Sequence, residues 1–280
     1  GVTMRPSQPI LRPSTAHIVR PPAQYRPVEY SSPCGRIQIV NGDAFAVLSN
    51  LPDASLDALV TDPPYCSGSA TLTGIQADPS KKYTQGGQKW VWPSFDNDCK
   101  SPHAWRLWLM TMLGEARRAL KDGAYVLMSS DWRRVSDAQA VIEGAGYIFR
   151  GIVPWDKGLG SRAPHTGYFR HQCEYVLWGT KGPCLKRAGG PFPGVFTHPN
   201  ERPGVKQHVT GKPIALMTDL LRPLPEGCLI LDPFAGSAST GVAALKTGRR
   251  FLGVEITPHY FKTACDRLKA TLADLGTGAA

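Results

Sequence analysis

The chain has 280 residues, of which 32 are Lys or Arg and 22 are Asp or Glu, so its formal net charge is +10. Hydrophobic residues make up 42% of the chain, and no apolar run approaches the roughly 18 residues that a membrane span needs. The composition excludes a membrane-spanning protein and predicts one large α/β domain or two smaller domains with a sizeable core.

Residues 1–35 contain seven prolines and no sustained period, which predicts an extended arm or tail. From residue 36 onward, short apolar runs alternate with helical patterns. Strands are expected at 36–40, 56–61, 124–130, 147–153, 173–179, 228–232 and 251–255. Helices are expected at 102–121, 132–144, 213–222, 239–247 and 258–274. This alternation predicts an α/β fold with a doubly wound, mostly parallel sheet of seven strands, in a single domain over residues 36–280.

Two long stretches, 66–100 and 182–210, show no period, and loops of this length in a compact domain are usually functional. The excess positive charge lies in part of the same region, since residues 150–212 carry ten basic and three acidic residues. Aromatic residues and four histidines accompany these cations, a combination that suits a polyanion with stackable bases. A solvated basic loop is the alternative that composition alone leaves open.

One motif, Thr61-Asp62-Pro63-Pro64-Tyr65, directly follows the strand expected at 56–61. Open α/β sheets bind ligands at the carboxyl ends of their strands. Two successive prolines fix φ and donate no backbone hydrogen bond, so the turn presents a carboxylate, a free carbonyl and an aromatic ring together. An ordinary turn that closes a strand is the alternative.

A second motif, at residues 229–241, is an apolar strand that ends in Asp232, followed by a turn of small residues that opens a helix. Small residues let a ligand approach the backbone at a helix N-terminus. Neither the P-loop nor G-x-G-x-x-G is present, which favours a nucleoside with an amino-acid carboxylate over a nucleotide di- or triphosphate. Glu255 ends the next strand, 23 residues after Asp232. An acid at this distance in a β-α-β unit typically accepts hydrogen bonds from ribose hydroxyls.

The seven cysteines are odd in number, and no two of them have the close spacing of zinc ligands. We therefore expect reduced, mostly buried thiols, without a metal site or a disulfide framework. The N-terminus has no apolar core like that of a signal peptide, which favours an intracellular protein.

Together these motifs resemble the permuted β group of the amino DNA methyltransferases, in which a catalytic Asp-Pro-Pro-Tyr precedes the S-adenosylmethionine motif. The family's Asp-Pro-Phe-x-Gly-Ser-Gly corresponds to residues 232–238, and its Thr-x-Lys-Pro element corresponds to residues 210–213. Its Gly-Asp element is similar to Gly42-Asp43, and its late strand is similar to residues 171–178. The resemblance covers about residues 36–270 and implies the Rossmann-like sheet of methyltransferases that use this cofactor.

One departure from the family pattern is Ala238, where the family usually has glycine; alanine is tolerable there if its φ is negative. The resemblance assigns catalysis to Asp62, Pro63, Pro64 and Tyr65. Asp62 and the Pro63 carbonyl would accept the two N–H groups of the target amine, and Tyr65 would stack on the flipped base. The implied cofactor is S-adenosylmethionine, without a metal, and the residues implied to bind it are Asp43, Asp62, Thr210, Lys212, Pro213, Asp232, Phe234, Ala235, Gly236, Ser237, Ser239 and Glu255.

The resemblance further implies double-stranded DNA as the partner, methylation at adenine N6, a role in restriction-modification and a cytoplasmic, nucleoid-associated location. We expect DNA-recognition inserts at about 66–100 and 182–210, with contacts from Arg162, Arg170, Lys186, Arg187, Arg202 and Lys206. A short recognition segment is also consistent with a homodimer. Cytosine N4 stays open as the target, because Asp in the first motif position is only a tendency toward adenine. A DNA-binding protein with a degenerate cofactor site is the alternative of a different class.

Overall fold

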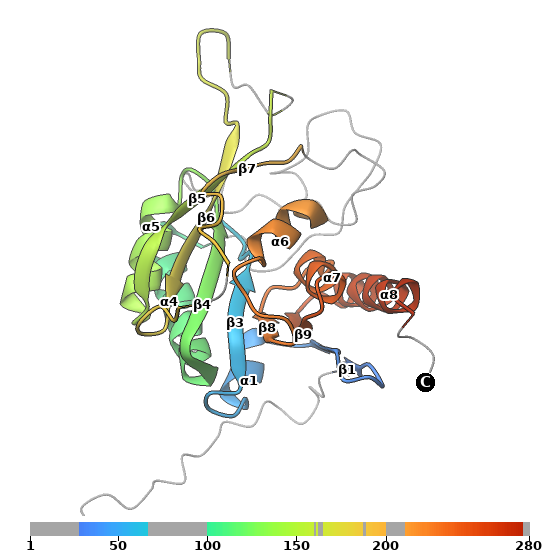
Figure 1. Cartoon of the computed structure of the whole chain (residues 1–280). Helices are drawn as coiled ribbons and strands as arrows, with labels where there is room; N and C mark the ends of the chain where they lie inside the picture. The colour runs from blue at the N-terminus through green and yellow to red at the C-terminus, as the bar shows by residue number, and fades with distance from the viewer. Residues whose placement is uncertain are drawn as a thin grey trace, which may run out of the picture.

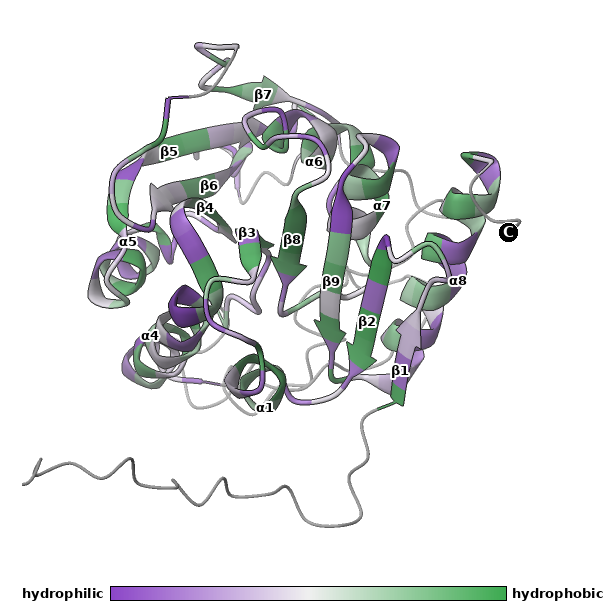
Figure 2. Ribbon diagram, turned by 60° about the horizontal axis from the view of Figure 1, so that its bottom comes forward, coloured by the Kyte–Doolittle hydropathy of each residue, from purple (hydrophilic) through white to green (hydrophobic). Residues whose placement is uncertain are grey.

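A mixed sheet of nine strands runs through the described part of the chain (Figures 1 and 2). This computed structural model describes residues 28–66, 100–159, 161, 165–186, 189–199 and 211–276. The strands are β1 Val28–Ser31, β2 Ile37–Asn41, β3 Leu56–Thr61, β4 Leu120–Ser130, β5 Ile148–Asp156, β6 Cys173–Thr180, β7 Phe196–Thr197, β8 Leu229–Asp232 and β9 Arg250–Glu255. Their order across the sheet is β1-β2-β9-β8-β3-β4-β6-β5-β7.

Strands β2, β9, β8, β3 and β4 are parallel neighbours, so their carboxyl ends meet at one edge of the sheet. Strand β6 is antiparallel to both of its neighbours, β4 and β5. Strand β5 therefore runs in the same direction as β3, and the start of β6 lies at the same edge as their ends. We call this edge, where Thr61, Asp156 and Asp232 end their strands, the carboxyl edge.

Helices cover both faces of the sheet, as Figure 2 shows. One layer contains α1 Ala44–Ser49, α4 Pro102–Ala119 and α5 Val135–Gly144; the other contains α6 Ile214–Leu220, α7 Ser239–Lys246 and α8 Pro258–Asp274. Each layer closes its own hydrophobic core against the sheet, because each helix buries one apolar face. None of the described helices is long and apolar enough to cross a membrane.

Local sequence accounts for the ends and the close packing of these helices. The Ser101 hydroxyl accepts the backbone N–H of Ala104 at the start of α4, and Pro102 occupies the first turn, where its missing N–H costs nothing. Gly241 lets α7 approach the sheet and α8: a Cβ there would lie 2.7 Å from Phe251 and 2.8 Å from Leu268. This close contact fixes the N-terminus of α7 beside the end of β8.

The predicted doubly wound, mostly parallel sheet is confirmed, and all seven expected strands are present within a few residues. The count of seven was wrong, because the described residues contain two further short edge strands, β1 and β7. The expected arm, 1–35, was too long, since β1 lies inside it and pairs with β2. Residues 1–27, residues 67–99 of the first expected insert and residues 187–188 and 200–210 of the second lie outside the described residues.

Candidate active site

The two predicted motifs meet at the carboxyl edge, where β3 and β8 lie side by side. The Thr61 hydroxyl donates a hydrogen bond of 3.0 Å to Asp232 Oδ1, although 171 positions separate the two residues. The helix that follows β8 packs on one face of the sheet, and α4, the next described helix after β3, packs on the other. This is the switch-point arrangement at which open α/β sheets bind ligands.

Four polar side chains from the turn after β3, from β6 and from the segment before α6 form a largely buried cluster, which we call the catalytic cluster after the role predicted for Asp62 and Tyr65. Lys212 Nζ lies 2.6 Å from Asp62 Oδ2 and 3.1 Å from Glu174 Oε2, and it donates to the Tyr65 hydroxyl at 2.9 Å. The Tyr65 hydroxyl lies 2.7 Å from Asp62 Oδ1 and 3.2 Å from Glu174 Oε2, and the shorter distance favours donation to Asp62. Lys157 binds the other oxygen of Glu174 at 3.2 Å.

Burial and charge shift the pKa values of this cluster in opposite directions. Burial raises the pKa of Asp62 above its usual value, and the Lys212 ammonium opposes that shift. Burial also acts to raise the pKa of Glu174, but Lys212 and Lys157 outweigh it and lower this pKa to about 2. The two carboxylates raise the pKa of Lys212 although its burial acts against this. Lys212 is thus held as a cation between two carboxylates.

The backbone of the Asp-Pro-Pro-Tyr turn is held from α4 and from the start of α5. The Trp105 indole donates to the Pro64 carbonyl at 2.7 Å, and the Arg134 guanidinium donates to the Tyr65 carbonyl at 3.0 Å. Arg134 also donates to the carbonyl of Cys66, a residue with φ of 50°. No described residue donates to the Pro63 carbonyl, so this acceptor is left open next to Asp62.

The loop after β8 is held by its own polar groups. Asp232 accepts from the Thr240 hydroxyl at 2.7 Å, the backbone N–H of Phe234 at 3.1 Å and the Thr61 hydroxyl. Burial raises the pKa of Asp232 to about 7, although these hydrogen bonds act to lower it. Because its oxygens already bind three protein donors, Asp232 shapes the loop from within.

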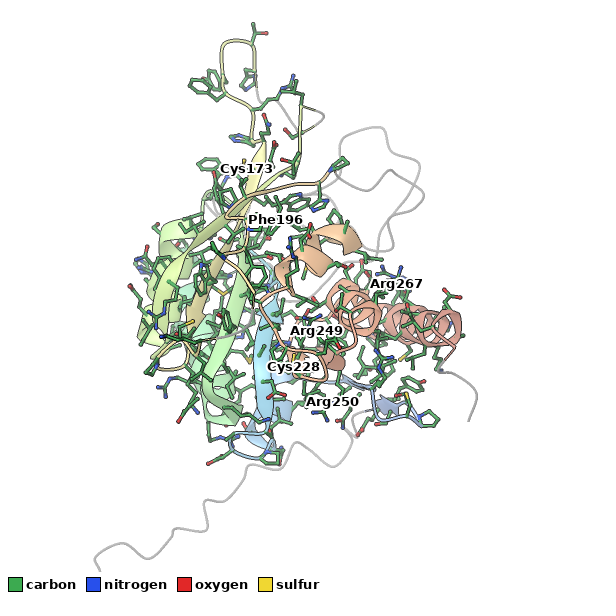
Figure 3. The ribbon with its side chains drawn as sticks, in the orientation of Figure 1. Cys173, Phe196, Cys228, Arg249, Arg250 and Arg267 are labelled. Atoms are coloured by element: carbon green, nitrogen blue, oxygen red, sulfur yellow. The ribbon has the colours of Figure 1, made fainter. Side chains whose placement is uncertain are left out.

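Two further contacts fix the small residues of this loop. Arg267 on α8, labelled in Figure 3, donates to the Ser237 carbonyl at 2.6 Å and hydroxyl at 2.8 Å, and reaches the Ser239 hydroxyl at 3.5 Å. Ala238 has φ of 61° and ψ of 40°, which is the left-handed region. The condition under which alanine is tolerable here, a negative φ, is therefore not met, and glycine is common there in the resembled family because it adopts this conformation without strain.

Two acids stand at the ends of the neighbouring strands. Asp43 is exposed and caps α1 by accepting the Ala46 N–H at Oδ1. Glu255 accepts the backbone N–H of Gly236 and of Thr257, one at each carboxylate oxygen, both at 2.8 Å. An ionised carboxylate has about four acceptor sites, so such an acid can bind a ligand hydroxyl or amine in addition to backbone N–H groups.

Most of the predicted site residues in the described part lie at or beside this edge. Lys212 contacts Asp62, another of the residues predicted to bind the cofactor, and its own contact with the cofactor stays a prediction. Pro213 precedes α6 and is buried, while Ala235 packs under the loop, its N–H bonded to the Val254 carbonyl. Arg170 and Lys186 are exposed, Arg170 donating to the Ser161 carbonyl. The remaining predicted residues lie outside the described residues: Thr210, Arg162, Arg187, Arg202 and Lys206.

The sequence analysis missed Glu174, Trp105 and Arg134. Glu174 is the single acid within the apolar strand β6, and an acid in a strand buried on both faces is itself a signal of a site. Trp105 lies in the helix expected at 102–121, and nothing local in the sequence shows that its N–H reaches Pro64. Six cysteines of the described residues are free, and no group of three metal-binding side chains occurs among those residues.

A family model described as DNA methylase matches residues 56–189 and 186–266, which together hold the catalytic cluster and the loop after β8. The provisionally named methylase YubD of Escherichia coli (strain K12) is 30% identical over 250 residues, 87% of this chain and 95% of that protein. The type II methyltransferase M2.DpnII of Streptococcus pneumoniae is 27% identical over 253 residues, 83% of this chain and 89% of that protein.

Solved structures share the fold. The complex of M1.HpyAVI with SAM matches with a TM-score of 0.59 at 22% identity, covering 83% of this chain and 98% of that one. The cytosine-N4-specific PvuII DNA methyltransferase matches with a TM-score of 0.63 at 17% identity, covering 89% of this chain and 95% of that one. The matched family model spans most of the chain and includes both motifs that meet at the carboxyl edge, and this chain belongs to the DNA methylase family.

Proposed function

We propose that this protein transfers a methyl group from S-adenosylmethionine to N6 of an adenine that is turned out of double-stranded DNA. The observation that carries the proposal is the pair of acceptors at the end of β3. The Asp62 carboxylate and the Pro63 carbonyl belong to consecutive residues of the turn, and no described residue donates to the Pro63 carbonyl. An exocyclic amine has two N–H groups, and two adjacent acceptors bind both of them.

These acceptors address the main difficulty of the reaction. The lone pair of an adenine amino nitrogen is delocalised into the ring, so the free amine is a poor nucleophile. Asp62 and Pro63 would bind both N–H groups, fix the orientation of the nitrogen and stabilise the positive charge that develops on it. Asp62 needs no strongly raised basicity, because the amine becomes acidic only when it gains the methyl group.

Tyr65 would stack on the flipped base. Lys212 Nζ is 2.9 Å from the Tyr65 hydroxyl and 5.2 Å from its ring centre, so the ammonium lies near the hydroxyl end of the ring. Flipping costs about 2–3 kcal/mol, and a base stacked on the ring face would recover part of this cost.

The residues at the carboxyl edge fit the proposed cofactor. S-adenosylmethionine supplies an activated methyl group on a sulfonium. Asp43 and Glu255 would accept hydrogen bonds from its adenosine part, and the loop of small residues 235–238 would lie beside its methionine part. The M1.HpyAVI complex with SAM, which shares the fold, supports this cofactor.

Adenine is preferred because Asp is the first residue of the catalytic motif. Cytosine N4 presents the same local geometry, and the PvuII enzyme with the same fold is named as cytosine-N4-specific. The type II name of M2.DpnII supports a role in restriction-modification.

One experiment tests both the activity and the base. Duplex DNA is incubated with the protein and labelled S-adenosylmethionine, digested to nucleosides and separated by mass. We expect N6-methyl-2′-deoxyadenosine; N4-methyl-2′-deoxycytidine would reject adenine but keep the enzyme class. No methylation, together with no heat of S-adenosylmethionine binding to the folded protein, would favour a DNA-binding protein with a degenerate cofactor site. Asp62→Ala should abolish transfer while the protein keeps its fold, and retained turnover would refute its role.

A further inference from the structure

The connection between β5 and β6, residues 157–172, projects beyond the carboxyl edge (Figure 1), and we call it the hairpin tip. Its two strands pair up to the register Asp156–Cys173, and Cys173 marks the return to the sheet in Figure 3. Of the tip, residues 157–159, 161 and 165–172 are described. The tip therefore leaves the sheet and returns to it at the edge that carries the catalytic cluster.

Two large aromatic side chains of the tip face solvent. Phe169 is 96% exposed and Tyr168 is 68% exposed. Tyr168 meets His165 edge to face at 5.4 Å, whereas Phe169 has no ring partner among the described residues. An exposed phenyl ring on a projecting turn contributes nothing to the core, and its burial against a partner would be favourable.

The charge of the tip indicates the partner. Between Asp156 and Glu174 the sequence has no acidic residue and three basic residues, Lys157, Arg162 and Arg170. Arg170 uses one donor on the Ser161 carbonyl, and a guanidinium has five N–H donors. Cations beside exposed aromatic rings suit a nucleic acid, whose phosphates and bases they bind together.

The base of the tip contacts the catalytic cluster directly. Lys157 binds Glu174, and Glu174 in turn lies 3.1 Å from Lys212 and 3.2 Å from the Tyr65 hydroxyl. Phe169 precedes Glu174 by five residues, so the chain allows at most about 18 Å between their Cα atoms. A base bound at Asp62 and the duplex that it left are within reach of the same tip.

We infer that Phe169 enters the DNA helix beside the flipped base and stacks in the place that the base leaves. The inference rests on the proposed function. Stacking on an aromatic side chain contributes about 1–3 kcal/mol per base, similar to the few kcal/mol that unstacking costs. Phe169 would therefore stabilise the open duplex, while Tyr65 stabilises the extruded base.

The test compares Phe169→Ala with the wild type on three DNA substrates of one sequence: a matched duplex, a duplex with the target base opposite a mismatch, and the single strand. On the matched duplex, kcat/KM should fall about 5- to 150-fold, the equivalent of the lost stacking. On the mismatched duplex and the single strand, where the base is already unpaired, the loss should be much smaller. Phe169→Trp should restore most of the activity on the matched duplex.

Controls separate this inference from the proposed function and from folding. Leu107→Ala removes another exposed apolar side chain, which lies on α4 and is 69% exposed. This variant should leave kcat/KM unchanged on all three substrates. Equal losses on all three substrates, or no loss on the matched duplex, would overturn the inference. A change in oligomeric state caused by Phe169→Ala would also overturn it, because the ring would then contact a second copy of the chain. Absence of methylation by the wild type on every substrate would reject the proposed function itself.

Discussion

Lys212→Met tests whether Lys212 positions the catalytic acid or binds the cofactor. Its side chain is only 6% exposed, and its ammonium contacts Asp62, Glu174 and Tyr65. Methionine keeps the length of the side chain but leaves two buried carboxylates close to each other, with only Lys157 to balance them. Removing one partner of a buried ion pair costs about 3–5 kcal/mol, a large part of the ~5–15 kcal/mol that stabilises a typical domain.

The loss of this cation should also change the chemistry. Without the ammonium, burial and Glu174 both raise the pKa of Asp62 further, so less of it is ionised near neutral pH. We therefore expect the acid limb of the kcat profile to move to higher pH. Misplacement of a catalytic group costs on the order of 100-fold in rate, and we expect kcat to fall by about that factor.

Three measurements decide the outcome: kcat against pH, S-adenosylmethionine affinity by calorimetry, and urea unfolding. If Lys212 positions Asp62, kcat falls while cofactor affinity is unchanged. A weakened cofactor affinity with a wild-type kcat at saturation would refute this reasoning and support the role that the family resemblance implied. Adding Glu174→Gln to Lys212→Met should recover part of the stability, since it removes the unpaired charge. Lys181→Met, at the opposite end of β6, is the matched control and should leave kcat unchanged.

Three further predictions concern the residues around the cluster. Ala238→Gly should leave the free energy of unfolding within about 1 kcal/mol of the wild type. Relief of the left-handed strain gains ~1–2 kcal/mol, and the loss of a buried methyl group together with the flexibility of glycine offsets this gain. A loss of stability above about 2 kcal/mol would contradict this balance. The carboxyl of Asp232, with its pKa raised to about 7 by burial, keeps its proton when folded but releases it when unfolded, so it lowers stability as pH rises from about 4 to about 7. In urea unfolding of Asp232→Asn across this pH range, stability should fall less with rising pH than in the wild type. An unchanged slope of the unfolding free energy against pH would argue against the contribution of Asp232. Trp105→Phe leaves the Pro64 carbonyl unpaired and should cost about 1–3 kcal/mol in thermal unfolding, whereas an unchanged melting temperature would show that this bond contributes nothing.

Much of the fold could be predicted because its central strands are nearly continuous apolar runs. Strands buried on both faces, such as β3 and β4, have this pattern, and the turns after β3 and β8 carry the motifs. The edge strands β1 and β7 were missed because they are short and partly exposed, so neither shows a period. The six-residue helix α1 was missed for the same reason.

The site could be predicted only where a motif is contiguous. The Asp-Pro-Pro-Tyr turn and the loop after β8 were located from local sequence, and the structure brings them together. The catalytic cluster was not predicted, since Asp62, Glu174 and Lys212 come from segments more than 35 residues apart along the chain. Which nitrogen or oxygen each of them contacts depends on packing, not on spacing. The positive φ of Ala238 shows the same limit, because alanine by itself predicts a negative φ.

The reversed direction of β6 has a consequence for how such proteins diversify. The chain leaves the sheet through β5 and re-enters it through β6, and both strands are fixed by backbone pairing before the tip begins. Insertions, deletions or exchanges beyond Lys157 then leave both Lys157 and Glu174 in register, so the tip can change without moving these two side chains. Exchange of residues 158–172 between relatives should therefore preserve the ion pairs of the cluster while it changes the exposed part of the tip.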